Sequence, residues 1–468
     1  MLLLLLFAAG FGLRILQFVQ TGHIVGVDGY YHLRIADEYA KGDFSNFVSY
    51  PPGIHLISAS FSYLTGSAEA SLAILSAFFS SLAIIGVFLI TRQRFGQGAA
   101  LLSAVFIAFS AQAVSYGSLV KNLNFSIAIL AFGIWLSYGK RMLPFMATTA
   151  ILALFSPLDA AALAAIAMIS SLMPAATGKG KIDRKKLYIS IALLAAAALF
   201  GTLYINGSFA SLYLTKSLPE SMLNILFYTP SAQDFLLRLS PFLLVFAAAG
   251  LWTAARKKES LELVIAVAAL AVAFPLGIIE TDRWYVYSTL FLSVFAGYGL
   301  FLFWEISRTS KKALALFTAV MLSILLSGLV LSAAALEANS WGLMTKERYS
   351  QLEWLRENTP TNSVVLGTIS ESHWIFGVAM RTPVATANLI EDPAFSGHIN
   401  DIEKIYTTTD RHERERLLDA YNISYIMISD KTWWLFGDVM KNFEGPGFRE
   451  VYEDGIYAIL EYTPSASD

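Results

Sequence analysis

The stretch Val27-Asp28-Gly29-Tyr30-Tyr31-His32-Leu33-Arg34 follows closely on the apolar segment Met1–Val19. An acidic residue, two tyrosines, a histidine and an arginine are an unusual composition for a linker at the mouth of a membrane helix. Charged groups that pack against membrane helices tend to be functional. The stretch therefore predicts a site at the bilayer surface that holds a metal ion or a polar headgroup.

The composition around this stretch indicates a membrane protein. Of the 468 residues, 56% are hydrophobic and 15% are charged, whereas soluble domains carry about 25% charged residues. The apolar runs predict about 11 membrane spans. These lie near Met1–Val19, Ser71–Ile90, Ala99–Val114, Leu123–Ser137, Leu143–Phe155, Leu158–Met173, Leu187–Ile205, Leu239–Ala254, Leu261–Ile279, Trp284–Trp304 and Ala313–Ala335.

The distribution of basic residues predicts the orientation of these spans. With the N-terminus in the cytoplasm, most lysines and arginines fall in inside loops, as the positive-inside rule requires. The outside loops hold only Arg34, Lys41, Lys121, Lys216, Arg238 and Arg283. We expect the first apolar segment to be a retained helix, because Arg14 interrupts it and no basic residue precedes it, unlike a signal peptide. The Asp28 segment and the C-terminal part then lie outside the cytoplasm.

The composition changes near Glu337, where charges become frequent and apolar runs shrink to strand length. Strands are expected at 364–366, 384–386, 425–428 and 456–462, and helices at 347–357 and 411–421. Asp410, with Glu413 three residues later, predicts a helix start. The fold class is therefore a polytopic α-helical membrane protein, residues 1–336, with a C-terminal soluble α/β domain, residues 337–468. The chain has no cysteine, and its net charge of −2 gives no reason to expect a nucleic-acid partner.

Asp28 is the first candidate for chemistry. Its carboxylate suits a divalent cation such as Mg²⁺ or Mn²⁺, or can act as a general base. Arg34 can pair with a phosphate, and Tyr31 and His32 lie between the two in the sequence. The alternative is an interfacial tyrosine belt with an Asp that caps the next helix.

Two further outside segments carry polar candidates. Lys121, Asn122 and Asn124 begin one span; the amides are weak cation ligands, and Lys121 supplies a positive charge where a metal would otherwise sit. The alternative is a helix start capped by Asn122. Glu220 lies in a long outside segment that can close over an acceptor or steady a metal; otherwise it is a solvated carboxylate.

The last two candidates are Arg283 and His373. Arg283, beside Trp284 at a helix junction, can bind a phosphate bidentately, or can pair with Asp282 or Glu280. His373 follows Glu371 at a spacing that does not share one helical face, and the histidines show no zinc-ligand spacing. It is otherwise a partly exposed histidine of the C-terminal domain.

The order of these segments resembles that of the catalytic subunit of oligosaccharyltransferase, in its single-subunit archaeal and bacterial forms. Residues 28–34 are similar to the first acidic motif of that family, with Gly29 where Pro is usual. Residues 217–220 look like its Ser/Thr-x-x-Glu motif, and Arg283 falls where the family has an arginine for the lipid pyrophosphate. Residues 373–388 look like the stretch after its signature pentapeptide.

The chain departs from the family in two places. The second acidic motif should supply carboxylates, but Asn122 and Asn124 stand at the matching positions. The signature Trp-Trp-Asp-Tyr-Gly, which reads the acceptor sequon, is replaced by Ile369-Ser370-Glu371-Ser372-His373. The metal site and the sequon reader are the features that these departures affect.

The resemblance implies a C-type glycosyltransferase fold and transfer of a glycan from a polyprenyl phosphate or pyrophosphate carrier, on the extracytoplasmic face, to an acceptor such as protein asparagine. Asp28 would bind a metal or act as base, Arg283 would hold the leaving phosphate, and Glu220 would close over the acceptor. One alternative is a transferase that uses polyprenyl-monophosphate sugars and a lipid or glycan acceptor, which both departures favour. The others are a non-catalytic lipid- or glycan-binding protein and a transporter.

Overall fold

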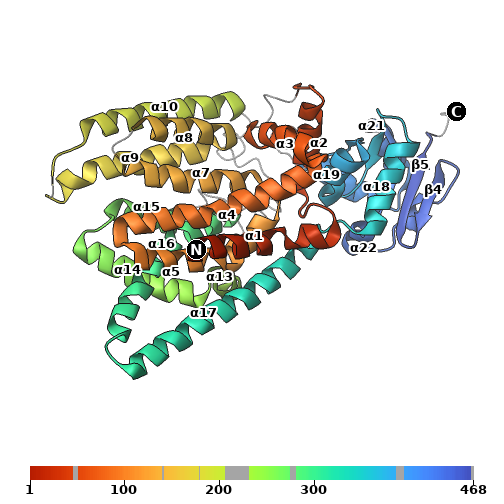
Figure 1. The fold of residues 1–468 in the computed structure, drawn as a ribbon. Coiled ribbons are helices and arrows are strands. Elements are labelled where there is room, and N and C mark those ends of the chain that lie inside the picture. Colours follow the sequence, from red (N-terminus) through yellow and green to blue (C-terminus); the bar gives the residue numbers. More distant parts are fainter. Residues whose placement is uncertain are drawn as a thin grey trace.

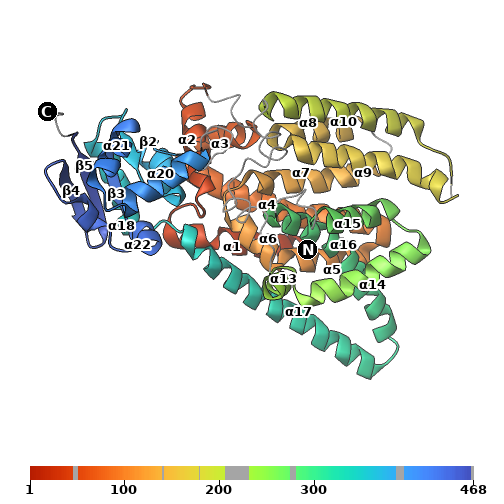
Figure 2. The same cartoon turned by 180° about the vertical axis from the view of Figure 1, so that it is seen from behind.

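The computed structural model describes residues 1–45, 51–139, 142–178, 180–205, 231–274, 281–385 and 395–464. Long helices form one end of the molecule, and a small sheet with short helices forms the other (Figure 1). The view from behind shows the same division, with α17 running obliquely along one side of the bundle to the strand-bearing end (Figure 2). The expected fold class is confirmed: a helical membrane part precedes an α/β part.

Each expected span falls on a helix or on a bent pair of helices, as far as the structure describes it; residues 275–279 of the span expected at Leu261–Ile279 lie outside the described residues. Within the described residues, five helices are long and apolar enough to cross a membrane, or up to seven if each bent pair is one span. The multi-pass membrane assignment is therefore confirmed. The helices are α1 (Leu2–Thr21), α4 (Ala68–Phe95), α5 (Gln97–Ala108), α6 (Ala111–Ser118), α7 (Asn122–Ser137), α8 (Met142–Phe155), α9 (Pro157–Ala176), α10 (Arg184–Ile205), α13 (Ala232–Leu239), α14 (Pro241–Lys257), α15 (Leu261–Ala273), α16 (Thr281–Ser307) and α17 (Lys311–Ala338).

The span expected near 99–114 is broken into α5 and α6, which meet at 54°. Ser110 begins α6 by accepting a hydrogen bond from the Ala113 N–H. The carbonyls left open at the end of α5 accept hydrogen bonds from Arg14 of α1, whose guanidinium lies 3.1 Å from the Ile107 oxygen and 3.4 Å from that of Ala108. Arg14 thus satisfies backbone groups that could not face lipid.

The segment after α1, expected to be a loop outside the membrane, contains two helices. These are α2 (Asp28–Ala40) and α3 (Gly53–Thr65). The loop expectation was wrong because Tyr30, Tyr31, Ile35 and Tyr39 bury one face of α2 against the rest of the protein. Asp28 is the first residue of α2 rather than its capping residue, which is Val27.

The C-terminal part is a mixed five-stranded sheet with helices on both faces. The strand order is β2-β1-β3-β5-β4, with β1 parallel to β2 and β3, and β5 antiparallel to β3 and β4. The elements are η1 (Asn339–Gly342), α18 (Lys346–Asn358), β1 (Val364–Leu366), η2 (Ile369–Glu371), α19 (Ser372–Trp374), η3 (Ile375–Ala379), β2 (Thr382–Pro383), α20 (Phe395–Thr407), α21 (Arg411–Ala420), β3 (Ile423–Ile428), α22 (Asp430–Phe436), η4 (Met440–Phe443), β4 (Phe448–Asp454) and β5 (Tyr457–Tyr462).

The expected strands and helices of this part occur with small shifts. The strand expected at 384–386 is instead β2, two residues earlier, and Thr386 lies outside the described residues. The expected helix start is confirmed, because the Asp410 carboxylate accepts hydrogen bonds from the His412 and Glu413 N–H groups.

One hydrophobic core runs from the sheet into the membrane part. It joins Val365 and Met427 of the sheet to Trp374 and to Tyr30 of α2. Gly377 of η3 packs on α2 so closely that an added Cβ would lie 2.2 Å from the Tyr30 carbonyl oxygen. The absence of a side chain at residue 377 thus brings the segment around His373 against the start of α2.

Candidate functional site

Three backbone segments far apart in the chain meet at the start of α2. Val25 forms a parallel bridge with Leu119, and the Val120 N–H donates to the Val25 carbonyl at 3.4 Å. Gly26, with φ of 92°, donates to the Gly342 carbonyl at 3.1 Å. The turn before Asp28 is therefore held by the α6–α7 connection and by the segment that follows α17.

This arrangement surrounds the Asp28 carboxylate with basic groups. The Lys121 ammonium lies 3.4 Å from Asp28 Oδ2, and His373 Nδ1 lies 3.7 Å from Oδ1. The Asp28 side chain is 51% exposed, whereas that of His373 is 6% exposed. The site is thus an accessible carboxylate whose neighbours are fixed by packing, and it unites three of the predicted residues.

The charges around Asp28 favour its ionised form. The protein packed around Asp28 by itself raises the pKa of the carboxyl, but Lys121, His373 and His32 outweigh that effect, so this pKa is lowered. Burial lowers the pKa of His373, although Asp28 and the Val27 backbone oppose the shift. The site therefore combines a carboxylate with an ammonium and a mainly neutral imidazole near neutral pH.

The other predicted residues of α2 hold elements together. His32 Nδ1 lies 2.9 Å from Nε2 of His55, and burial lowers the pKa of His32 to about 4. The Tyr31 ring stacks on Phe376 of η3. Arg34 donates to Glu38 at 2.8 Å and to the Phe376 carbonyl at 3.3 Å. Tyr31 and Arg34 therefore join α2 to the C-terminal part.

Asn122 and Asn124 point into the protein. The Asn122 amide donates to the Phe155 carbonyl. The Asn124 amide donates to Ser76 Oγ at 2.8 Å and to the carbonyls of Tyr116 and Leu119 at 3.0 and 2.6 Å. These amides fix the α6–α7 connection, and thereby Lys121, through contacts within the protein.

Arg238, for which the sequence predicted no role, lines a cavity that also includes Tyr116. Arg283 interacts with Tyr287, whereas Arg238, at the end of α13, donates to Asp282 at 3.0 Å and to Gln112 at 3.3 Å. The available signal was a basic residue directly before a span, in a segment expected to lie outside, where the positive-inside rule leaves few basic residues. Glu220 lies outside the described residues.

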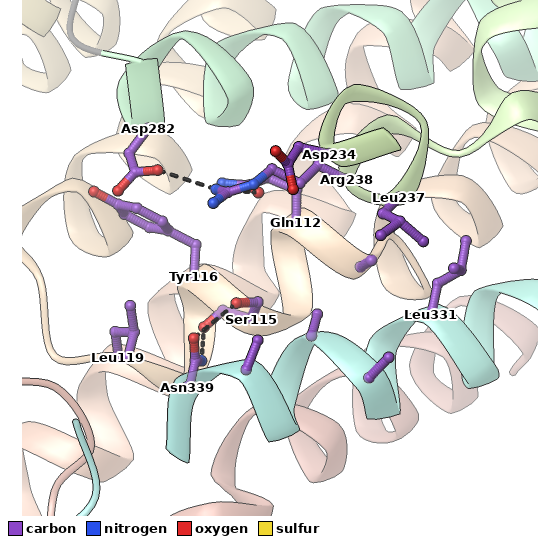
Figure 3. Close-up of a pocket in the computed structure, with 14 residues that line it drawn as sticks. Gln112, Ser115, Tyr116, Leu119, Asp234, Leu237, Arg238, Asp282, Leu331 and Asn339 are labelled. Carbon is purple, nitrogen blue, oxygen red and sulfur yellow. Dashed lines mark hydrogen bonds and ion pairs between the residues drawn. The ribbon is translucent and has the colours of Figure 1, made fainter. Parts of the chain in front are cut away.

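A cavity of about 280 Å³ opens beside this arginine (Figure 3). Gln112 and Tyr116 of α6, Arg238 of α13 and Asp282 of α16 form its polar side, and α17 forms the opposite side. Lys121 lies 5.0 Å from the centre of the Tyr116 ring. Tyr116 thus connects the cavity to the Lys121–Asp28 pair.

The described residues around Asp28 do not by themselves fit a divalent cation. Mg²⁺ and Ca²⁺ require several oxygen ligands, but the Lys121 ammonium is an ion-pair partner of Asp28, and both asparagines face inward. Within the described ranges, no group of three or more His, Asp or Glu residues is placed to hold a metal. The positive charge beside Asp28 comes from Lys121.

The sequence is similar to one family profile. Residues 49–205 match the family described as dolichyl-phosphate-mannose-protein mannosyltransferase. This segment runs from before α3 to the end of α10, and includes Lys121 but not Asp28. No curated protein matches the sequence at a significant level.

Solved structures resemble the whole chain. The apo oligosaccharyltransferase of Archaeoglobus fulgidus is 17% identical, with a TM-score of 0.68 over 100% of this chain and 74% of that one. ArnT of Cupriavidus metallidurans, bound to undecaprenyl phosphate, is 14% identical, with a TM-score of 0.62 over 99% and 98% of the two chains. A further A. fulgidus structure contains an inhibitory peptide and a dolichol-phosphate. The chain therefore has the C-type glycosyltransferase fold, and the expected resemblance to oligosaccharyltransferase is confirmed at the level of the fold.

Proposed function

We propose that the protein is a membrane glycosyltransferase that transfers a sugar from a polyprenyl phosphate or pyrophosphate carrier to an acceptor. The single observation that carries the proposal is the accessible Asp28 carboxylate between Lys121 and His373. The fold supports it, because the similar structures include proteins bound to undecaprenyl phosphate and to dolichol-phosphate.

Asp28 serves as the general base. Its lowered pKa keeps it ionised near neutral pH, so it accepts the proton of an acceptor group whose oxygen or nitrogen then attacks the anomeric carbon. The bond from that carbon to the phosphate oxygen breaks, and the carrier phosphate leaves with the electron pair. Lys121 stabilises the negative charge that develops on the phosphate.

The surroundings of Asp28 favour a hydroxyl acceptor on a lipid or glycan, and a monophosphate carrier. A hydroxyl needs one base, and Asp28 is the only carboxylate whose contacts place it at this site within the described residues. The family profile that matches residues 49–205 is also named for a monophosphate-linked donor. Transfer to protein asparagine is the second candidate, supported by the match to oligosaccharyltransferase over the whole chain.

The reaction takes place on the extracytoplasmic face. The basic residues of the loops between spans support this orientation, since most of them fall in loops that the positive-inside rule assigns to the cytoplasm. In this orientation residues 337–468 form an extracytoplasmic domain, and residues 1–336 form the transferase domain. Glu220 and Arg283 keep their proposed roles at the acceptor and the leaving phosphate.

The test is transfer by the purified full-length protein in lipid bilayers. Labelled polyprenyl-phosphate sugar and polyprenyl-pyrophosphate glycan are each supplied with a sequon peptide or with a glycan or lipid acceptor. Asp28→Asn should lower the rate at least about 100-fold, the scale of general-base catalysis. Asp37→Asn, on the same helix and paired with Lys41, is the matched control. No transfer from any donor, or equal rates in wild type and Asp28→Asn, would reject the proposal.

A further inference from the structure

The cavity beside Arg238 has two chemically different sides (Figure 3). Arg238, Asp282 and Gln112 make one side polar. The other side is one face of α17, formed by Leu331, Ala334, Ala335 and Ala338. Residues spaced by three and four lie on the same side of a helix, so α17 presents a continuous row of small apolar side chains. An amphipathic ligand matches both sides.

The apolar side continues along α17. A second, smaller cavity is lined by Ile324 and Gly328 and shares Ala111 and Leu331 with the first. At a rise of 1.5 Å per residue, Gly328 and Ala338 are about 15 Å apart along the helix axis. The two cavities therefore lie along one face of α17, the larger at its polar end and the smaller, of about 20 Å³, further into the span.

The helix that forms this wall is accessible from the lipid. α17 is long and apolar enough to span a membrane, and little of it is buried in the protein. Leu326, Leu329 and Val330 are exposed on it, and α17 diverges from the bundle towards its beginning (Figure 1). The helix that forms the apolar wall of the cavity thus borders the lipid on its other side.

The polar end can receive an anion. Arg238 lies in the cavity, and Lys121 contacts the ring of Tyr116, which also lines it. The two carboxylates of the cavity are already engaged: Asp282 by Arg238, and Asp234 by the backbone and hydroxyl of Ser231 at the start of α13. A guanidinium also recognises phosphate well, because its planar donors match phosphate oxygens.

We infer that this cavity binds the carrier lipid, with the prenyl chain along the Leu331–Ala338 face of α17 and the phosphate at Arg238. The inference rests on the proposed function for the identity of the lipid. It adds the location of the prenyl chain and names Arg238 as a phosphate ligand besides Arg283. It also identifies a helix face that discriminates carriers by their shape. A straight, slender prenyl chain suits the alanine row, whereas a bulky side chain in that row would block it.

Equilibrium binding of labelled polyprenyl phosphate to the full-length protein in bilayers tests both ends of the site. Arg238→Ala should weaken binding about tenfold or more, as expected for loss of a charge-assisted hydrogen bond. Asp282→Asn should strengthen it, because a negative charge next to the phosphate is removed. Arg256→Ala, at the far end of α14 over Trp252, should leave it unchanged.

The part of the site that binds the prenyl chain is tested by substitutions in α17. Ala335→Phe should weaken binding about tenfold or more, whereas Ala333→Phe, two residues away and exposed outside the cavity, should not. Polyprenol and inorganic phosphate should each compete far less well than polyprenyl phosphate. Unchanged affinity in both Arg238→Ala and Ala335→Phe, or equal competition by polyprenol, would overturn the inference.

A measurement on the unaltered protein guards against variants that fail to fold. Polyprenyl phosphate with a photoreactive group in its chain should label residues 328–338, and unlabelled polyprenyl phosphate should suppress that labelling; labelling elsewhere would overturn the inference.

The two proposals, the transferase function and this lipid site, also fail differently. Binding at this site without transfer from any donor would reject only the proposed function, whereas transfer that is insensitive to Arg238→Ala and Ala335→Phe would reject only this site.

Discussion

Replacing Gly377 by alanine tests whether close packing of η3 on α2 sets the catalytic geometry. The added Cβ would lie 2.2 Å from the Tyr30 carbonyl oxygen and 2.7 Å from its carbon. Ordinary contact begins at 3.4 Å, so the two segments must separate by about 1.2 Å. These two atoms of Tyr30 belong to the backbone of α2, which cannot rotate away as a side chain would.

The separation should act on both stability and rate. Overpacking of this kind costs about 1–3 kcal/mol. His373 lies one helical turn before Gly377, and its distance of 3.7 Å from Asp28 would change with the displacement. A misplacement of about 1 Å in a catalytic group can lower a rate about 100-fold. We therefore expect a folded variant with a lower melting temperature and a much reduced rate of sugar transfer.

The measurements are thermal unfolding and initial transfer rates in the same bilayer preparation. Gly397→Ala in α20 is the matched control, since no atom lies within 4 Å of the Cβ that it adds. Because alanine is the better helix former, this control should keep full activity and gain up to about 1 kcal/mol. Wild-type stability and rate in Gly377→Ala would refute the reasoning, because they would mean that the contact with Tyr30 does not constrain the site.

Three further predictions concern the charge beside the base, the metal and the membrane core. Lys121 lowers the pKa of Asp28, so in Lys121→Met this pKa rises and the acidic limb of the pH–rate profile should move to higher pH, whereas Lys41→Met should leave it in place. Transfer should be unaffected by a chelator of divalent cations, since Lys121 supplies the positive charge; loss of activity restored by Mg²⁺ or Mn²⁺ would contradict this. Arg14→Met should destabilise the protein by about 2–4 kcal/mol in thermal unfolding, because backbone carbonyls at the α5–α6 break lose their donor; a change no larger than that of the exposed Arg92→Met would count against that role.

The order and class of the elements could be read from the chain itself. Long apolar runs predict spans because a backbone in lipid must satisfy its own hydrogen bonds within a helix. The runs around 71–90 and 313–335 accordingly coincide with α4 and α17. The change in composition near Glu337 likewise marks the transition to strands and polar helices. Asp28 and Lys121 stood out because charged groups at the ends of membrane helices need a reason to be there.

What each polar group contacts was decided only when distant segments packed together. Lys121 meets Asp28 because the Val25–Leu119 bridge joins their two segments. His373 joins them because Gly377 permits close approach.

The same packing turned Asn124 inward and placed Arg238, rather than Arg283, on the cavity. Hydropathy and spacing act along the chain, so they specify elements. The pairing of side chains depends on contacts between residues far apart in sequence, which no local pattern encodes.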